Sequence, residues 1–315
     1  MKIAYILISS ENDYYAEQLL VSLYSLKLHN PDCNPVILTD RDTVINLKGR
    51  LKRINEFADE IIEIKLPEGM TGKEKSRFIK TSMLKYIDGD FLFIDVDTLI
   101  MKSLQEIVTY NCNIGAVLDC HTSATGNGQM LNCLKLKKIK NWVCFNYFNS
   151  GVVWVKDNEA TRKFFNDWHE IWYKDWKNYQ IVIDQFAFAQ ANLNNKNIVE
   201  EIPGQYNCQL TKCYYKFLLN AKIIHYMSDV PQNNDFPFKN IEILKKVREN
   251  GITEGIKDMI SDPLTFFLEK SIILSGNDLK IYNSPTVILG RKLSRDYPWI
   301  NKGIRFLYRL IGYKI

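Results

Sequence analysis

The sequence predicts an α/β protein with a Rossmann-like, mostly parallel sheet flanked by helices, followed by a mainly helical C-terminal appendage. Short apolar runs rich in β-branched residues alternate with segments of helical periodicity, which is the pattern of consecutive βαβ units. The run Phe91–Ile94 ends at two acids, Asp95 and Asp97, and open α/β sheets bind ligands at the carboxyl ends of their strands. A Pro- and Asn-rich stretch near residue 231 divides the chain into a predicted main domain, 1–230, and a C-terminal region, 231–315.

Composition bounds the class of protein. A chain of 315 residues with 46% hydrophobic residues can bury a large core. Seven cysteines without a CxxC pair indicate reduced thiols, and four scattered histidines argue against a zinc cluster. Neither a signal peptide nor an apolar stretch of membrane-spanning length is apparent in the sequence, so we expect a cytoplasmic protein.

The first predicted strand covers Lys2–Ser9, and a polar turn then leads into a helix that ends near His29. Asn12 and Asp13 are candidate caps of that helix, and Tyr15 offers an aromatic ring to a nucleobase. Further strands are predicted over Pro35–Asp40, Glu60–Leu66, Asn113–Leu118, Ile198–Ile202 and Ala221–His225, and the segment Phe148–Lys156 is predicted to begin with a polar turn that feeds another strand. Helices are predicted over Lys73–Tyr86, Glu159–Tyr173, Gln185–Ala191 and most of Ile241–Leu274.

The acids Asp95 and Asp97 are the strongest candidate site. In a strand, residues two apart point to the same face, so the two carboxylates repel unless a cation lies between them. Hard oxygen ligands suit Mn²⁺ or Mg²⁺. The alternative is a turn or a helix cap without a metal, because short motifs recur by chance.

Other candidate residues each have a structural and a functional interpretation. Arg77 and Lys80 either form a solvated helix face or contact phosphate, and Asp184 either caps the helix that follows it or contacts a substrate. The turn Asn149–Gly151 feeds a strand, and its glycine would let the backbone approach a ligand closely. His225, at a strand end, is either a metal ligand or a packed side chain.

Together these motifs resemble glycosyltransferase family 8, the family of glycogenin and of bacterial lipopolysaccharide galactosyl- and glucosyltransferases. The resemblance covers roughly residues 2–226. It is carried by the order and spacing of SENDYY, FIDVDT (the DxD motif), FNSGV, the pair Asp184-Gln185 and IIHY.

The resemblance implies a GT-A fold for the catalytic domain 1–230 and transfer of glucose or galactose from a UDP-sugar, with retention of configuration. Asp95, Asp97 and His225 would bind Mn²⁺ or Mg²⁺, and Asp184 and Gln185 would lie beside the anomeric carbon. The donor would be held by Ser9, Asn12 and Tyr15 at the nucleoside, by Lys80 at the phosphates or sugar, and by Asp119 and Asn149 at sugar hydroxyls.

One departure from the family pattern concerns the leaving phosphate. The family follows its histidine with a glycine and a Lys-Pro-Trp segment, whereas this chain reads HYMSDVPQNNDFPF and has no lysine before Lys239. We therefore assign the phosphate clamp to the metal, to Arg77 or Lys80, or to Lys239. The rival classes are a non-catalytic sugar-nucleotide or glycan-binding protein, which the missing lysine favours, and a nucleotidyltransferase, which the absence of a Gly-rich basic loop disfavours.

The C-terminal stretch 291–315 carries seven Lys or Arg residues against one Asp, with apolar residues at helical spacing. Such a basic amphipathic helix fits a membrane surface, and docking on its own domain is the alternative. We therefore expect a peripheral position on the inner face of the cell membrane and a glycan or glycolipid acceptor of the lipopolysaccharide or capsule type. Nucleic acid is not expected, because the basic residues are not combined with an aromatic platform.

Overall fold

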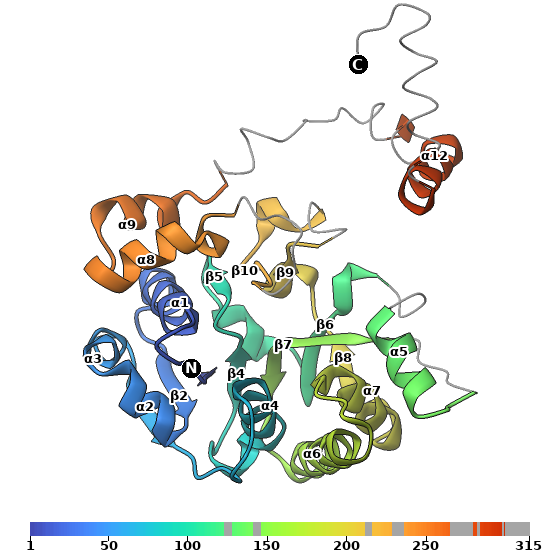
Figure 1. Cartoon of the computed structure of the whole chain (residues 1–315), viewed down its shortest axis with the longest axis horizontal. Coiled ribbons are helices and arrows are strands. Elements are labelled where there is room, and N and C mark those ends of the chain that lie inside the picture. Colours follow the sequence, from blue (N-terminus) through green and yellow to red (C-terminus); the bar gives the residue numbers. More distant parts are fainter. Residues whose placement is uncertain are drawn as a thin grey trace, which may run out of the picture. The chain divides into compact units, whose positions relative to one another are not determined.

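The computed structural model describes residues 1–122, 128–140, 146–211, 216–228, 236–264, 280–281, 284–297 and 299. The chain forms two compact units, Met1–Phe266 and Phe267–Ile315 (Figure 1). The first unit contains a central sheet flanked by helices, and the second contains the helix α12, Pro285–Asp296. Residues 300–315 and the side chains of 291–296 lie outside the described part, so the basic amphipathic helix stays a prediction.

A seven-stranded sheet forms the centre of the first unit, in the order β3-β2-β1-β4-β7-β6-β8. Its strands are β1 (Lys2–Leu7), β2 (Asn34–Thr39), β3 (Glu60–Glu63), β4 (Phe91–Ile94), β6 (Ile114–Leu118), β7 (Phe148–Val155) and β8 (Val199–Glu201). The first four strands pair in parallel, β8 is parallel to β6, and β7 alone runs antiparallel, between β4 and β6. The predicted mostly parallel sheet is therefore confirmed.

Helices cover both faces of this sheet. The larger α-helices are α1 (Tyr15–His29), α4 (Gly72–Ser82), α6 (Glu159–Tyr179) and α7 (Asp184–Asn194), and the smaller ones are α2 (Arg41–Leu47), α3 (Gly49–Asn55) and α5 (Gly128–Leu136). Phe91 and Phe93 of β4 pack with α4, α6 and α7 in one core cluster, which includes Trp168. The intervening Leu92 and Ile94 pack with α1 on the opposite face. Because successive side chains of a strand alternate, a fully apolar β4 contributes to both cores.

Local sequence signals set the starts of several helices. Thr71 and Glu74 form a capping box at α4, in which the Thr71 N–H donates to Glu74 Oε2 at 2.7 Å. Asp40 accepts from the Thr43 N–H at 3.0 Å and caps α2, so the acid that ends the second predicted strand begins a helix. Asn158 caps α6 in the same way.

The predicted turn at Asn149–Gly151 is wrong. These residues lie inside β7, whose pairing with β6 shifts register between Ala116 and Val117. The polar residues Asn149 and Ser150 remain in a fully buried strand, since their side chains line the cavity described below. The irregular pairing with β6 occurs at the same part of the strand.

A second, three-stranded sheet has the order β5-β10-β9, from β5 (Thr98–Ile100), β10 (Ile223–His225) and β9 (Cys208–Gln209). β5 begins directly after the two acids and pairs antiparallel with β10, so that Thr98 lies opposite His225. The small sheet therefore brings a histidine from late in the chain beside Asp95 and Asp97. Short 3-10 helices cover Met83–Lys85, Gln105–Thr109, Asp119–His121, Gly204–Asn207, Leu218–Asn220 and Pro237–Lys239.

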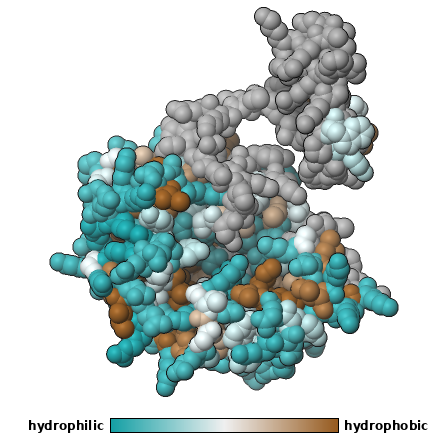
Figure 2. All heavy atoms as spheres, viewed as in Figure 1, coloured by the Kyte–Doolittle hydropathy of each residue, from teal (hydrophilic) through white to brown (hydrophobic). Residues whose placement is uncertain are grey.

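Two helices after residue 236 belong to the first unit. They are α8 (Ile241–Asn250) and α9 (Glu254–Ser261), and their buried side chains, such as Val247 and Ile260, turn toward the unit while both helices contact α1. They confirm the predicted helical character of 241–261, whereas the division into domains at residue 230 stays a prediction. Among the described residues, no helix combines the length and the apolar character needed to cross a bilayer. The face drawn in Figure 2 is mainly hydrophilic, with scattered apolar side chains.

Candidate metal and nucleotide site

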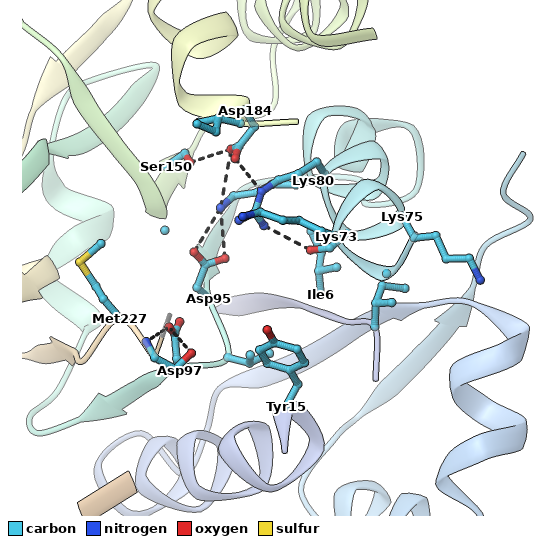
Figure 3. Close-up of a pocket in the computed structure, with 18 of the residues that line it drawn as sticks. Ile6, Tyr15, Lys73, Lys75, Lys80, Asp95, Asp97, Ser150, Asp184 and Met227 are labelled. Carbon is cyan, nitrogen blue, oxygen red and sulfur yellow. Dashed lines mark hydrogen bonds and ion pairs between the residues drawn. The ribbon is translucent and has the colours of Figure 1, made fainter. Parts of the chain in front are cut away.

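A cavity of about 1240 Å³ opens at the carboxyl edge of the parallel strands. Residues that follow β1, β2, β4 and β6 line it, and so does the polar start of the antiparallel strand β7. The cavity therefore lies at the edge where the sequence predicts ligand binding. Figure 3 shows its centre, where the side chain of Lys80 lies between those of Asp95 and Asp184.

Asp95, Asp97 and His225 converge in this cavity, with one potential ligand atom of each within 4.8 Å of the others. Asp97 Oδ1 lies 3.2 Å from His225 Nε2. The other carboxylate oxygen of Asp97 accepts from the Ser228 N–H at 2.7 Å and from its hydroxyl at 3.0 Å, which fixes the carboxylate. Two carboxylates and one imidazole form a donor set that fits Mn²⁺ or Mg²⁺.

Gly151 leaves room for this cluster. A Cβ atom at position 151 would collide with the ring of His225 and would lie 2.8 Å from Asp95 Oδ2. The glycine therefore permits close packing of the proposed metal ligands against β7, rather than shaping a turn.

A relay of buried amides orients His225. Asp119 Oδ1 accepts from Asn149 Nδ2 at 3.0 Å, Asn149 Oδ1 accepts from Asn207 Nδ2 at 2.9 Å, and His225 Nδ1 lies 3.0 Å from Asn207 Oδ1. An ionised carboxylate can only accept hydrogen bonds, so Asn149 must present its N–H to Asp119 and its oxygen to Asn207. Asn207 must in turn present its N–H to Asn149. Asn207 therefore presents its oxygen to His225, Nδ1 carries a proton, and Nε2 faces the acids.

A second buried cluster surrounds Asp184. Arg77 Nε lies 2.8 Å from Asp184 Oδ1, the Ser150 hydroxyl donates to Oδ2 at 2.7 Å, and Lys80 Nζ lies 3.8 Å from Oδ2. Lys80 Nζ also lies 3.1 Å from Asp95 Oδ1, so it joins the two clusters (Figure 3). Asp184 does not cap α7: it is the first residue of the helix, the cap position is Ile183, and its carboxylate faces the cavity.

These contacts set the charges of the site. Burial alone would raise the pKa of Asp184, but Lys80, Arg77 and Ser150 outweigh it and lower that pKa below its usual value. Burial likewise opposes ionisation of Asp97, yet His225 and Ser228 hold the pKa of Asp97 well below its usual range. Both groups are therefore anionic at neutral pH, available to a cation or to a developing positive charge.

Residues 70–223 match the family model described as nucleotide-diphospho-sugar transferase. The matched segment, just under half of the chain, is similar to the transferases of that family. No curated protein sequence matches the chain.

Solved structures share the fold of this chain at low sequence identity. The galactosyltransferase LgtC, crystallised with donor and acceptor sugar analogues, is 17% identical, with 82% of this chain and 99% of that chain covered and a TM-score of 0.53. Mouse xyloside xylosyltransferase 1 is 13% identical, with 73% and 99% covered and a TM-score of 0.50. GlyE of Streptococcus pneumoniae TIGR4 is 16% identical, with 85% and 63% covered and a TM-score of 0.50. The GT-A fold, with a domain like that of family 8, is confirmed.

The fold brings most of the predicted site residues to one cavity. Its lining includes Ser9, Tyr15, Arg77, Lys80, Asp95, Asp97, Asp119, Asn149, Asp184, Gln185 and His225. Asn12 does not line it: its side chain is exposed, and Asp13 faces the cavity instead and accepts from the Ser9 and Ser10 hydroxyls at 2.6 and 2.8 Å. Lys239 donates to the Met227 carbonyl and is not part of the lining, so Arg77 and Lys80 are the better placed candidates for the phosphate clamp.

Several residues of the site carry no signal that sequence reasoning used. Ser228 and Asn207 contact the proposed metal ligands from segments with no recognised motif. Lys75 lines the other end of the cavity, where it joins Asp40 and Asp42 at 2.7 and 2.5 Å. Their partners are distant in sequence, so only the folded chain reveals these contacts.

Proposed function

We propose that this protein is a metal-dependent retaining glycosyltransferase that moves glucose or galactose from a UDP-sugar to a glycan acceptor. The observation that carries the proposal is that Lys80 joins two clusters within one cavity. One cluster is the triad Asp95, Asp97 and His225, which could hold a metal, and the other surrounds the ionised Asp184. Sugar transfer needs a metal site and a carboxylate close together, because negative charge develops on the diphosphate while positive charge develops on the sugar.

Asp95, Asp97 and His225 would hold the metal, Mn²⁺ or Mg²⁺. When bound, the metal supplies a Lewis acid for the leaving diphosphate. Lys80 and Arg77 would add positive charge on the same side, in place of the family lysine that this chain lacks. Asp184 cannot act as a proton donor, because its pKa is lowered; its carboxylate would stabilise positive charge at the anomeric carbon, beside Gln185.

The size of the cavity agrees with two substrates. Its volume of about 1240 Å³ exceeds the roughly 300–1,000 Å³ of typical ligand pockets, which leaves room for an acceptor beside the donor. Asn149 uses both lone pairs of Oδ1 within the protein, on Gly151 N–H and Asn207, so a sugar hydroxyl would meet its remaining N–H. We extend the proposal to a lipid-linked acceptor of the lipopolysaccharide or capsule type, at the inner face of the cell membrane.

The proposal is tested by thermal unfolding of the purified protein with UDP-, GDP- and CMP-sugars, each with Mn²⁺ or with EDTA, followed by an assay of released UDP. Binding to the folded state raises the midpoint by mass action. We expect a rise with one UDP-sugar in Mn²⁺, release of UDP, and loss of both in Asp97→Ala. UDP-sugar binding without release of UDP, even with candidate acceptors present, would instead favour a non-catalytic binding protein.

A further inference from the structure

The loop between β1 and α1 forms one end of the cavity, through Ser9, Ser10, Asp13 and the adjoining Tyr15. The proposed function would place the nucleoside of the donor at this end. Two arginines hold the backbone of the loop from outside. Arg248 Nη1 donates to the Glu11 carbonyl at 2.9 Å and Nη2 donates to the Asp13 carbonyl, while Arg50 Nη1 donates to the Ser10 carbonyl at 3.2 Å. Three carbonyls of one short loop are therefore fixed by guanidinium groups.

Both guanidiniums share one buried acid, Glu17, whose side chain is 3% exposed. Arg50 Nε lies 2.8 Å from Glu17 Oε1, and Arg248 lies 3.1 Å from Oε1 through Nε and 3.0 Å from Oε2 through Nη2. The Arg248 guanidinium also lies 4.2 Å from the ring centre of Tyr14. The planar guanidinium of Arg248 thus donates along one edge to Glu17 and along the other to the carbonyls of the loop.

Arg248 reaches this loop from α8, a helix that lies beyond the segment matched by the family model. Leu244 and Val247 bury one face of α8. Its C-terminal carbonyls, at residues 247, 248 and 249, accept from Arg53 at 3.2, 2.7 and 2.9 Å. Two arginines therefore attach the helix besides its buried face, and of these two attachments the one through Arg248 contacts the loop between β1 and α1.

We propose that Arg248 is a positioning residue for nucleotide binding, and that α8 supports the donor site through it from outside the cavity. Arg248 fixes the carbonyls of Glu11 and Asp13, and this orients Asp13 and Tyr15 toward the cavity. The inference rests on the proposed function, since it assumes that the nucleotide occupies this end of the cavity.

Arg53→Ala is the matched control, because it removes three hydrogen bonds to the C-terminal carbonyls of α8 and none to the loop, while the buried Leu244 and Val247 still hold the helix. Two measurements distinguish the variants: hydrogen exchange of the amides in residues 9–15, and titration with UDP in saturating Mn²⁺. For Arg248→Ala we expect faster hydrogen exchange in the loop. We also expect UDP to bind more weakly. Each change should be about 10- to 100-fold, the range expected when hydrogen bonds to a charged group are lost. Arg53→Ala should lower the unfolding midpoint while both readouts stay within about twofold of wild type. Arg248→Lys should recover only part of the affinity, because one ammonium cannot reproduce the fork.

Equal effects of Arg248→Ala and Arg53→Ala on loop exchange would overturn the positioning role, as would unchanged exchange in Arg248→Ala. If the wild-type protein binds no UDP, the proposed function fails, and loop exchange still decides whether Arg248 orders the loop. Unchanged UDP affinity in Arg248→Ala, with UDP bound by wild type, would overturn the inference alone.

Discussion

Replacement of Lys80 by Met tests the charge balance of the site most directly. Lys80 is buried, 3.1 Å from Asp95 Oδ1 and 3.8 Å from Asp184 Oδ2. At an effective dielectric constant of about 20, these separations give gross attractions of about 5 and 4 kcal/mol. The net loss is smaller, because Arg77 and Ser150 still pair with Asp184, Asp95 is one-quarter exposed, and Lys80 itself no longer has to be desolvated.

We therefore expect Lys80→Met to lower the free energy of unfolding by about 3 kcal/mol, near the lower end of the range for removing one partner of a buried pair. For a unit of this size, that corresponds to a fall of about 6–9 °C in the unfolding midpoint. Mn²⁺ should then raise the midpoint of the variant by more than that of wild type, because the cation no longer competes with an ammonium beside Asp95. Transfer from a UDP-sugar should be lost.

Scanning calorimetry with and without Mn²⁺ measures both effects. Lys137→Met is the matched control: the Lys137 side chain is 12% exposed, its Nζ lies 2.6 Å from Asp175 Oδ1, and neither residue is among those lining the cavity. It should lower stability similarly while leaving the Mn²⁺ effect as in wild type. An unchanged midpoint in Lys80→Met, or equal Mn²⁺ effects in both variants, would refute the reasoning.

Two further predictions concern the histidine. Asn207→Leu should weaken Mn²⁺ binding by about 10- to 100-fold, because metal-ligating histidines depend on a partner for their second nitrogen. Calorimetric titration measures the affinity for Mn²⁺. A variant with wild-type affinity would exclude a role for the amide relay. Burial alone would lower the pKa of His225, but Asp97 and Asp95 outweigh it and the pKa is raised above its usual 6.5. A raised pKa means that the stability gained from protonated His225 is complete below pH 6.5 and is lost as pH rises through the raised value. The affinity for Mn²⁺ should instead increase as the pH rises, by at most about tenfold per pH unit between pH 6.5 and the raised pKa, because binding releases the proton of His225. In His225→Ala, both the proton release and this pH dependence of the affinity should be abolished.

Short-range patterns in the sequence predicted most of the secondary structure. The alternation of apolar runs and helical periods located β1, β4 and α1 close to their observed bounds, because these signals depend on neighbouring residues only. The motif at Asp95 and Asp97 also predicted the edge of the sheet at which the cavity lies. The error at Asn149–Gly151 has a non-local cause, since polar residues in a buried strand are tolerated here by irregular pairing with β6 and by the cavity.

The sequence by itself determined the class of fold, the order of the elements and the acids at the end of β4, because hydrogen bonding within helices and the burial of alternating faces are encoded over a few residues. Only the tertiary structure decided which polar groups share a site. Arg248 meets Glu17 across 231 positions, and Asn207 meets Asn149 across 58, so neither contact follows from local spacing. The physical reason is that strand order and the packing of helices on the sheet bring these residues together, and both depend on burial of the whole core.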